Sequence, residues 1–382
     1  MKSYFSNLKN IFNFLSKIDF ILFFLSLSLS IIGLSVIYSF SGNNLLFDKQ
    51  LISLGVSIIV FFVVSSLDIY FLKNSKFIYL VYFLSVGLLL GLLLSGVAIS
   101  GAQSWFKLGL FAFQPTDLVK FVLVLLLAKY FYKRHIEISR LKHIFISWFY
   151  TFVLFILVAL QPDLGSAMII FFIWFGFILI SGIPKKYILA FFILGSIISV
   201  LLYNCVLLDY QKKRIDTFMN PGADPLGAGY KIIQANISLG SGEVFGKGIM
   251  NGSQARLGFL PESETDFIFS AFAEEWGFIG IVVLFSIFSV LILRIVLIAM
   301  NGRTNFESLL VAGIAIYFFS NFFVHVGINL GFLPVTGTTM PFMSYGGSHL
   351  LIEYFALGIV VAISRTNRNY SKSDTEDISI IG

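Results

Sequence analysis

The chain has 382 residues, of which 58% are hydrophobic and only 12% are charged, and its formal net charge is +6. This composition excludes a soluble globular protein, because 45 phenylalanines and repeated apolar runs of about 20 residues exceed what a core of this size can bury. The basic residues lie between the apolar runs and not among solvent-facing aromatics, which excludes a nucleic-acid-binding surface. The sequence therefore predicts a single integral membrane domain over residues 1–382, an all-α polytopic membrane protein.

Ten apolar runs have the length, roughly 17 to 25 residues, that a helix needs to cross about 30 Å of hydrocarbon. The predicted spans are residues 20–40, 50–67, 77–96, 115–131, 143–160, 165–182, 187–208, 270–298, 308–330 and 346–364. The first run is too long for a signal-peptide core and has no small-residue cleavage site, so it is interpreted as a retained span. The single cysteine, Cys205, excludes an intrachain disulfide and a cysteine-based metal site.

The positions of the basic residues predict the orientation of the spans. With the N-terminus in the cytoplasm, sixteen Lys and Arg residues fall on the inner side, whereas the short outer connections keep only Lys49 and Lys107. The positive-inside rule therefore predicts that both termini are cytoplasmic. It also predicts a long extracytoplasmic loop, 209–265, between spans seven and eight, and a cytoplasmic tail, 366–382, whose polar composition is typical of disorder.

The long outer loop is rich in glycine, as in "NPGADPLGAGYKIIQANISLGSGEVFGKGIMNG" at residues 220–252. Glycine lets a backbone approach a ligand closely, but the same composition is typical of a flexible, solvated linker, and composition alone favours the linker. A short apolar-periodic segment around 230–239 interrupts the glycines. The loop also contains groups able to bind phosphate or sugar: Lys212, Lys213, Arg214, Lys231, Gln234, Lys247 and Arg256.

Charged residues also lie at the outer ends of the predicted spans. Each needs a structural or functional explanation, because placing a charge in a membrane costs free energy. In "FQPTDLVKF", Asp117 and Lys120 are three residues apart on one helical face, so an ion pair and a functional role are equally favoured. In "LQPDLGSAM", Gln161 and Asp163 flank a proline, which by itself is more typical of a capped turn than of a site.

Three carboxylates, Glu262, Glu264 and Asp266, precede the run 270–298 within "FLPESETDFIF". The ordinary explanation is that a helix dipole favours negative charge at its start. The predicted topology, however, gathers several titratable groups and an aromatic residue on the outer side, which favours a polar cavity. These residues are Trp105, Asp117, Lys120, Asp163, Arg214 and Asp266.

Six motifs give the chain a specific resemblance: "FQPTDLVK", "QPDLGSA", "NPGADPLGAGYKIIQANISLGSGEVFGKG", "LPESETDFIF", "AEEWGF" and "GFLPVTGTTMPFMSYGGS". In this order they resemble the SEDS family, the shape, elongation, division and sporulation proteins that polymerise peptidoglycan. The resemblance covers nearly the whole chain. "GINLGFLPVTG" is similar to the elongation branch, whereas the division branch typically has Thr-Lys-Gly where this chain has Val335, Thr336 and Gly337.

The resemblance implies a glycosyltransferase of the bacterial cytoplasmic (inner) membrane. Its substrate would be lipid II, and its other partners undecaprenyl diphosphate-linked glycan, membrane lipids and a class B penicillin-binding transpeptidase. Asp266 matches the family's essential aspartate in its "TDF" motif. Substrate contacts are implied for Trp105, Gln114, Lys120, Asp163 and Arg214, and we add by position Asp117, Gln161, Glu262, Glu264 and Glu274.

Three positions depart from the usual family residues. Ser104 stands where the family usually has Arg, Asp117 where it has Glu, and Glu264 where it has His. The first removes a phosphate contact, the second shortens a carboxylate arm, and the third adds negative charge beside Asp266. None of them changes Asp266 itself, so the expected reaction class stays the same.

The implied reaction needs two kinds of group. A sugar hydroxyl is a poor nucleophile at neutral pH, so one carboxylate must act as general base, and Asp266 is predicted for that role. The departing diphosphate needs a nearby positive charge, which is expected from Lys120, Arg214 or a divalent cation such as Mg²⁺. The sequence by itself establishes no cofactor. Glu262 and Glu264 are predicted to raise the pKa of Asp266 or to bind a cation, and Glu274 to orient a neighbour.

Two alternatives come from other functional classes. A lipid II flippase or another polytopic transporter would also have about ten spans with charges near the membrane, but a carrier needs polar groups that are accessible from both sides. A noncatalytic scaffold for wall enzymes would need no isolated base. The clustering of candidates on the outer side favours the enzyme, then the transporter, then the scaffold.

Overall fold

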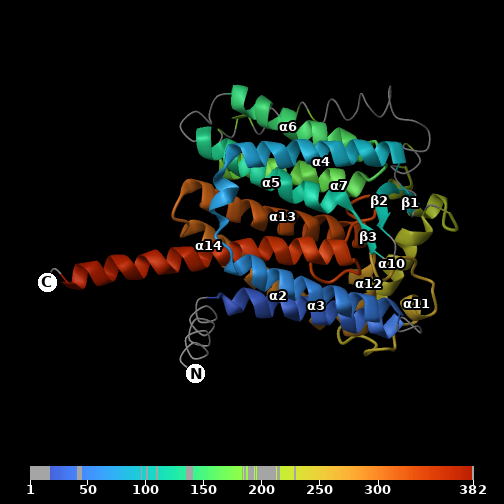
Figure 1. Ribbon diagram of the computed structural model, residues 1–382. Coiled ribbons are helices and arrows are strands. Elements are labelled where there is room, and N and C mark those ends of the chain that lie inside the picture. Colours follow the sequence, from blue (N-terminus) through green and yellow to red (C-terminus); the bar gives the residue numbers. More distant parts are fainter. Residues whose placement is uncertain are drawn as a thin grey trace.

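The computed structural model describes residues 18–40, 45–95, 97–99, 102–108, 111–134, 141–182, 184, 186–187, 193, 195, 212, 216–227 and 229–380. The helices of the bundle are α2 (Phe20–Phe40), α3 (Leu45–Ser66), α4 (Ser75–Ser95), α5 (Pro115–Arg134), α6 (Leu141–Ala159), α7 (Leu164–Ile180), α12 (Ile268–Met300), α13 (Asn305–Asn329) and α14 (Gly347–Ile380). They run side by side, and α2 begins at the same end of the bundle from which α14 projects (Figure 1). The all-α polytopic fold is confirmed.

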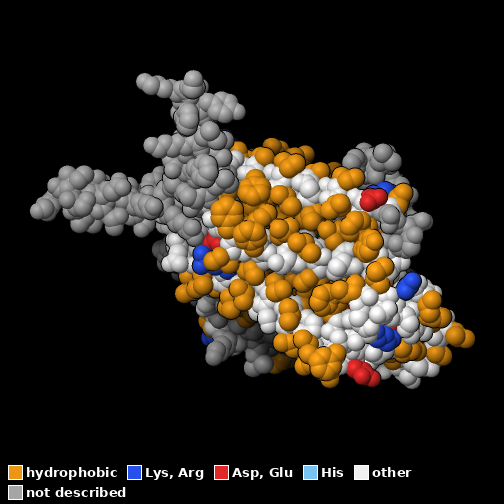
Figure 2. Space-filling view, turned by 90° about the horizontal axis from the view of Figure 1, so that it is seen from below, with side chains coloured by type: hydrophobic (Ala, Val, Ile, Leu, Met, Phe, Trp, Pro, Cys, Tyr) orange, Lys and Arg blue, Asp and Glu red, His pale blue; other side chains and the backbone are white. Residues whose placement is uncertain are grey.

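Nine of the ten predicted spans correspond to these helices, and the seventh, 187–208, lies almost wholly outside the described residues. Seven described helices are long and apolar enough to cross a membrane. Of the other two, α5 has 20 residues but carries more charge, and α7 has 17. On the face shown in Figure 2, hydrophobic side chains spread across the middle of the bundle, and the few charged side chains lie toward its two ends.

Helices α5, α13 and α14 form the interior of the bundle. The most apolar 18-residue windows of α13 and α14 are 67% and 78% buried, against 28% for α3, α4 and α6. The interior helices bury small and polar side chains, such as Gly313, Asn321 and Glu353, beside their apolar ones. This is expected in a membrane, where small residues let helices approach and polar groups face the protein interior.

The connection between α4 and α5 contains a small antiparallel sheet that the sequence did not predict. Its strands are β1 (Val97–Ile99), β2 (Ala102–Leu108) and β3 (Phe111–Phe113), in the order β1-β2-β3. Trp105 pairs with Val97, and Phe106 pairs with Phe113. The sheet lies at the end of the bundle opposite the projecting part of α14, and it contacts α4, α5 and α14 (Figure 1).

The prediction of an unstructured tail was wrong for the described part of that segment, because α14 continues to Ile380. The segment after Arg365 contains neither proline nor glycine before Gly382. Extending an existing helix costs far less than nucleating a new one, so a polar sequence can propagate a helix that starts inside the bundle.

The outer loop 209–265 is folded where the structure describes it, and the linker interpretation is wrong there. It contains α10 (Tyr230–Ser241), which corresponds to the apolar-periodic segment, and α11 (Ser253–Arg256). Both helices contact α12. Figure 1 shows α10 and α11 at the same end of the bundle as the sheet.

Helix α12 is broken at Gly277, whose φ of 66° is left-handed. The outer loop pairs with the broken backbone: the amides of Lys247 and Gly248 donate to the carbonyls of Glu274 and Glu275, at 3.0 Å each. In return, the amides of residues 278 and 279 donate to the carbonyls of residues 243 and 244, at 2.9 and 3.1 Å. The outer loop therefore supplies partners for two carbonyls and two amides at the break, where backbone groups without partners would be costly in a membrane protein.

Glycine is required on both sides of this pairing. A Cβ atom on Gly277 would lie 2.2 Å from the backbone nitrogen of Gly246, and one on Gly246 would lie 2.1 Å from the carbonyl oxygen of Glu275. Two of the loop glycines that composition associates with flexibility, Gly242 and Gly246, thus serve close backbone packing.

Candidate functional site

Asp266 lies just before α12 and close to Lys231 on α10 of the outer loop. The N-cap position of α12 is Phe267, which makes no side-chain capping hydrogen bond, so Asp266 is not the N-cap residue of this helix. The carboxylate faces the loop that follows α13: a Cβ atom on Gly337 would lie 3.4 Å from Asp266 Oδ2. Burial, and next the negative charge of Glu262, raise the pKa of Asp266 to about 7.

The three neighbouring carboxylates have different environments. Glu262 raises the pKa of Asp266, whereas the Lys231 ammonium on α10 opposes that rise. The side chain of Glu264 accepts a hydrogen bond from Ser263 Oγ at 3.2 Å, and its charge adds to burial in raising the pKa of the Tyr345 hydroxyl. Glu262 therefore has the predicted influence on Asp266, while Glu264 faces other groups.

Asp117 and Lys120 form the predicted ion pair on α5, with Lys120 Nζ 3.0 Å from Asp117 Oδ1. Both side chains are buried. The same Asp117 oxygen lies 3.4 Å from Nδ1 of His349 on α14, and Nε2 of His349 lies 2.9 Å from Oε1 of Glu353. The pair is thus one part of a buried polar group that joins α5 and α14.

Asp163 is the N-cap of α7, as its position after Pro162 suggested: its Oδ1 accepts a hydrogen bond from the Ser166 amide at 3.0 Å. Its Oδ2 accepts one from Gln114 Nε2 at 3.4 Å. Burial raises the pKa of Asp163, and the Lys120 ammonium opposes that rise. Asp163 also raises the pKa of Asp266, so Gln114, Lys120, Asp163 and Asp266 belong to one cluster.

The segment 331–346 between α13 and α14, here called the α13–α14 loop, packs among these groups. Ser344 Oγ donates to the carbonyl of Thr265 at 2.8 Å, and the Tyr345 amide donates to the carbonyl of Glu264 at 2.8 Å. The hydroxyls of Thr336 and Thr338 are buried, and neither has a hydrogen-bond partner among the described residues. The loop therefore holds the backbone of the two residues before Asp266 and adds unsatisfied hydroxyls nearby.

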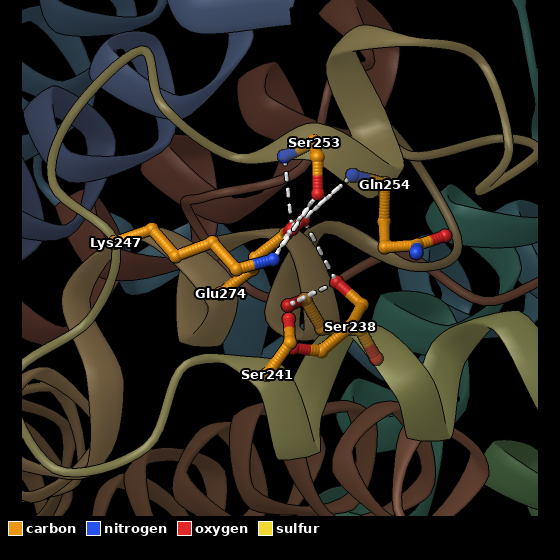
Figure 3. Close-up of polar contacts among 7 residues, drawn as sticks. Ser238, Ser241, Lys247, Ser253, Gln254 and Glu274 are labelled. Atoms are coloured by element: carbon orange, nitrogen blue, oxygen red, sulfur yellow. Dashed lines mark hydrogen bonds and ion pairs between the residues drawn. The ribbon is translucent and has the colours of Figure 1, made fainter.

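Gln161 and Glu274 lie apart from this cluster in their contacts. Gln161 is buried and donates from Nε2 to the carbonyl of Leu89 on α4, at 3.0 Å. Glu274 is fully buried and holds the outer loop: its Oε1 lies 2.6 Å from Lys247 Nζ and accepts from the Ser253 and Gln254 amides at 2.9 and 3.2 Å (Figure 3).

The side chains of three residues named from the sequence lie outside what the structure describes. Arg214 lies outside the described residues. The backbone of Ser104 and Trp105 belongs to β2, but their side chains lie outside what the structure describes. Among the described residues, no group of three or more His, Cys, Asp and Glu side chains is arranged to hold a metal ion.

Sequence reasoning missed His349, Glu353 and the two threonines. The spacing of His349 and Glu353 places them on one face of a helix, and a charged residue within a predicted span is a functional signal. That signal was present in "SHLLIEYF" at residues 348–355. Their proximity to Asp117 could not be predicted from the sequence, because it depends on how α5 packs against α14.

Comparisons with known proteins agree over most of the chain. The family model of cell cycle proteins that comprises FtsW, RodA and SpoVE matches residues 9–369. Peptidoglycan glycosyltransferase MrdB of Escherichia coli is 33% identical over 349 residues, which are 91% of this chain and 93% of MrdB.

Two solved structures are also similar to the chain. One belongs to a peptidoglycan synthase complex that coordinates polymerization and crosslinking; it has a TM-score of 0.79 and 30% identity, and covers 92% of this chain and 98% of its own. The other is the rod shape determining protein RodA of Thermus thermophilus, with a TM-score of 0.69 and 29% identity, covering 92% and 97%.

Proposed function

We propose a catalytic scheme whose premise is that the chain belongs to the SEDS family, the cell cycle proteins that comprise FtsW, RodA and SpoVE. The chain is a peptidoglycan glycosyltransferase and a multi-pass membrane protein. Its substrate is lipid II, which it polymerises into glycan strands during cell elongation. Polymer formation from purified lipid II by the purified chain is the direct test.

The observation that carries the scheme is the environment of Asp266. Its carboxylate is partly buried, lies outside the N-cap position of α12, and has a pKa raised to about 7. A general base is most effective when its pKa lies near the working pH, because it is then both deprotonated and basic enough to take a proton. Asp266 takes the proton from the acceptor sugar hydroxyl as that oxygen attacks the anomeric carbon of the donor sugar.

The departing diphosphate needs positive charge and no acid. Lys120 supplies it, because its ammonium is buried near Asp163 and is held by Asp117 at 3.0 Å. Fixed charge in a buried site stabilises developing negative charge more strongly than it does in water. Trp105 and Arg214 complete the substrate contacts, and Gln161 supports the turn that carries Asp163.

Glu262 and Glu264 have separate parts in this scheme. Glu262 keeps Asp266 basic, and Glu264 holds the segment before α12 against the α13–α14 loop through its backbone carbonyl. Glu274 acts indirectly, by docking the outer loop onto α12.

A class B penicillin-binding transpeptidase is the proposed protein partner, since a similar chain belongs to a peptidoglycan synthase complex. We expect such a transpeptidase to copurify with the chain and to raise its rate of polymer formation. Mild detergent extraction, affinity purification and mass spectrometry test the association. Full activity of the isolated chain, together with no transpeptidase in the purified material, would contradict it.

The site is proposed to face the outer side of the bacterial inner membrane, with both termini in the cytoplasm. Cysteine labelling tests this after Cys205 is replaced by serine. A cysteine at Phe245, which is 81% exposed in the outer loop, should react with a membrane-impermeant maleimide in intact spheroplasts. A cysteine at Tyr70, which is 78% exposed between α3 and α4, should react only after lysis. The reverse pattern would place the site in the cytoplasm.

A further inference from the structure

His349 and Glu353 form a buried pair that the catalytic scheme does not use. They are four residues apart near the start of α14, so they lie on one face of that helix. Their side chains are 3% and 0% exposed. The imidazole lies between two carboxylates, with Nδ1 3.4 Å from Asp117 Oδ1 and Nε2 2.9 Å from Glu353 Oε1.

The group contains two acidic and two basic side chains. Asp117 and Glu353 are two buried carboxylates, and Lys120 is one buried ammonium. His349 lies between the two acids, and its imidazole adds a second positive charge when it is protonated. Removing one member of a buried ionic group is costly because it leaves a neighbouring charge unpaired, whereas removing a matched pair leaves the remainder balanced.

Glu353 also reaches the α13–α14 loop. Its Oε2 accepts a hydrogen bond of 2.7 Å from the Phe342 amide. Phe342 has a φ of 62°, in the left-handed region that a bulky side chain rarely adopts, so the surrounding contacts must hold it there. The same loop carries Gly337, which faces the Asp266 carboxylate, and Ser344, which binds the backbone before it.

A continuous chain of contacts therefore joins the two halves of the site. It runs from Lys120 to Asp117 on α5, through His349 and Glu353 on α14, to the loop that faces Asp266. We propose that His349 and Glu353 are positioning residues that fix the Lys120 ammonium relative to the Asp266 carboxylate. This inference rests on the proposed function, in which Asp266 takes the proton from the attacking hydroxyl and Lys120 stabilises the departing diphosphate.

The test uses the full-length purified chain, lipid II in detergent, and three variants: His349→Gln, Glu353→Gln and the double variant. A glutamine at position 353 can still accept the hydrogen bond from Phe342, so the variant removes the charge and keeps an acceptor for the loop. We expect each single variant to lower kcat by about tenfold or more, with KM for lipid II changed less than about threefold. The charge-balanced double variant should lie between the singles and the wild type, because neighbouring charges couple.

A role in stability alone would lower the yield of folded protein and leave kcat per folded molecule unchanged. His143→Gln is the matched control, because His143 is also a buried histidine but lies on α6, beside Tyr130. If a single variant does not fold, the double variant decides: a lowered kcat supports the proposal. Wild-type kcat in the folded variants overturns it. Failure of the proposed catalytic scheme can be distinguished from failure of this inference, because it would appear as retained polymer formation by Asp266→Asn.

Discussion

The Asp266→Asn variant is expected to fold, insert into the membrane and bind lipid II, but to form no glycan polymer. Asparagine keeps the size of the side chain and removes only its ability to take a proton. Loss of a general base typically lowers the rate by about 10²- to 10⁴-fold. Gel analysis of the polymer formed from purified lipid II measures the loss directly.

The raised pKa gives this prediction a second readout. With a pKa of about 7, Asp266 is mostly protonated at pH 6 and mostly ionised at pH 8, so the wild-type rate should rise across that interval. Stability changes in the opposite sense. A carboxyl whose pKa is raised on folding destabilises the folded state as pH rises from its unfolded value through its folded value. Asp266→Asn should therefore gain more in thermal stability over the wild type at pH 8 than at pH 4.5.

Glu264→His is the control for the acidic segment. It restores the usual family residue at a position where the side chain contacts Ser263 and influences Tyr345, so it should retain activity. Near wild-type polymerisation by Asp266→Asn would show that the base assignment is wrong. The chain would still be a polymerase, and another group would have to take the proton from the acceptor hydroxyl.

Glu274→Ala is expected to destabilise the protein by about 3 kcal/mol, because it removes the acceptor for Lys247 and for two loop amides from a fully buried position. Thermal unfolding in detergent measures this loss. Limited proteolysis should also cleave the variant faster between Gly240 and Gly252, where the contacts to Glu274 normally hold the loop. Glu274→Gln should be affected less, since its amide keeps a hydrogen-bond acceptor.

The control is Glu243→Gln, which changes an exposed carboxylate in the same loop and should alter neither stability nor cleavage. A direct role of Glu274 in substrate binding makes a different prediction. In that case Glu274→Gln would raise KM for lipid II while leaving the unfolding temperature and the cleavage rate unchanged.

Helix positions and the Asp117–Lys120 ion pair were predictable from the sequence. Apolar runs fixed α2 to within a residue at each end, and the spacing of Asp117 and Lys120 predicted their ion pair. Both signals are local: a span depends on length and hydropathy, and a pair three residues apart depends only on helix geometry.

The features that depend on packing between distant segments were not predictable. A helix such as α12 is apolar on all sides, so its pattern does not show which face is buried, nor that a loop some 30 residues upstream pairs with it at Gly277. Likewise, the 3.4 Å approach of His349 to Asp117 joins residues 232 positions apart. The prediction that the glycines of the outer loop form a flexible linker was wrong for the same reason. Their role in close packing depends on the α12 backbone, which is distant in the sequence.

The break in α12 also has a consequence for amide hydrogen exchange. In an unbroken helix, the amides of Phe278 and Ile279 would donate to carbonyls one turn earlier, and their exchange with solvent would require local unfolding of the helix. Here they donate to Glu243 and Val244 instead. Their exchange rates are therefore governed by the free energy of undocking the outer loop, so two amides within a membrane helix report how firmly the loop that carries Lys231 is held beside Asp266.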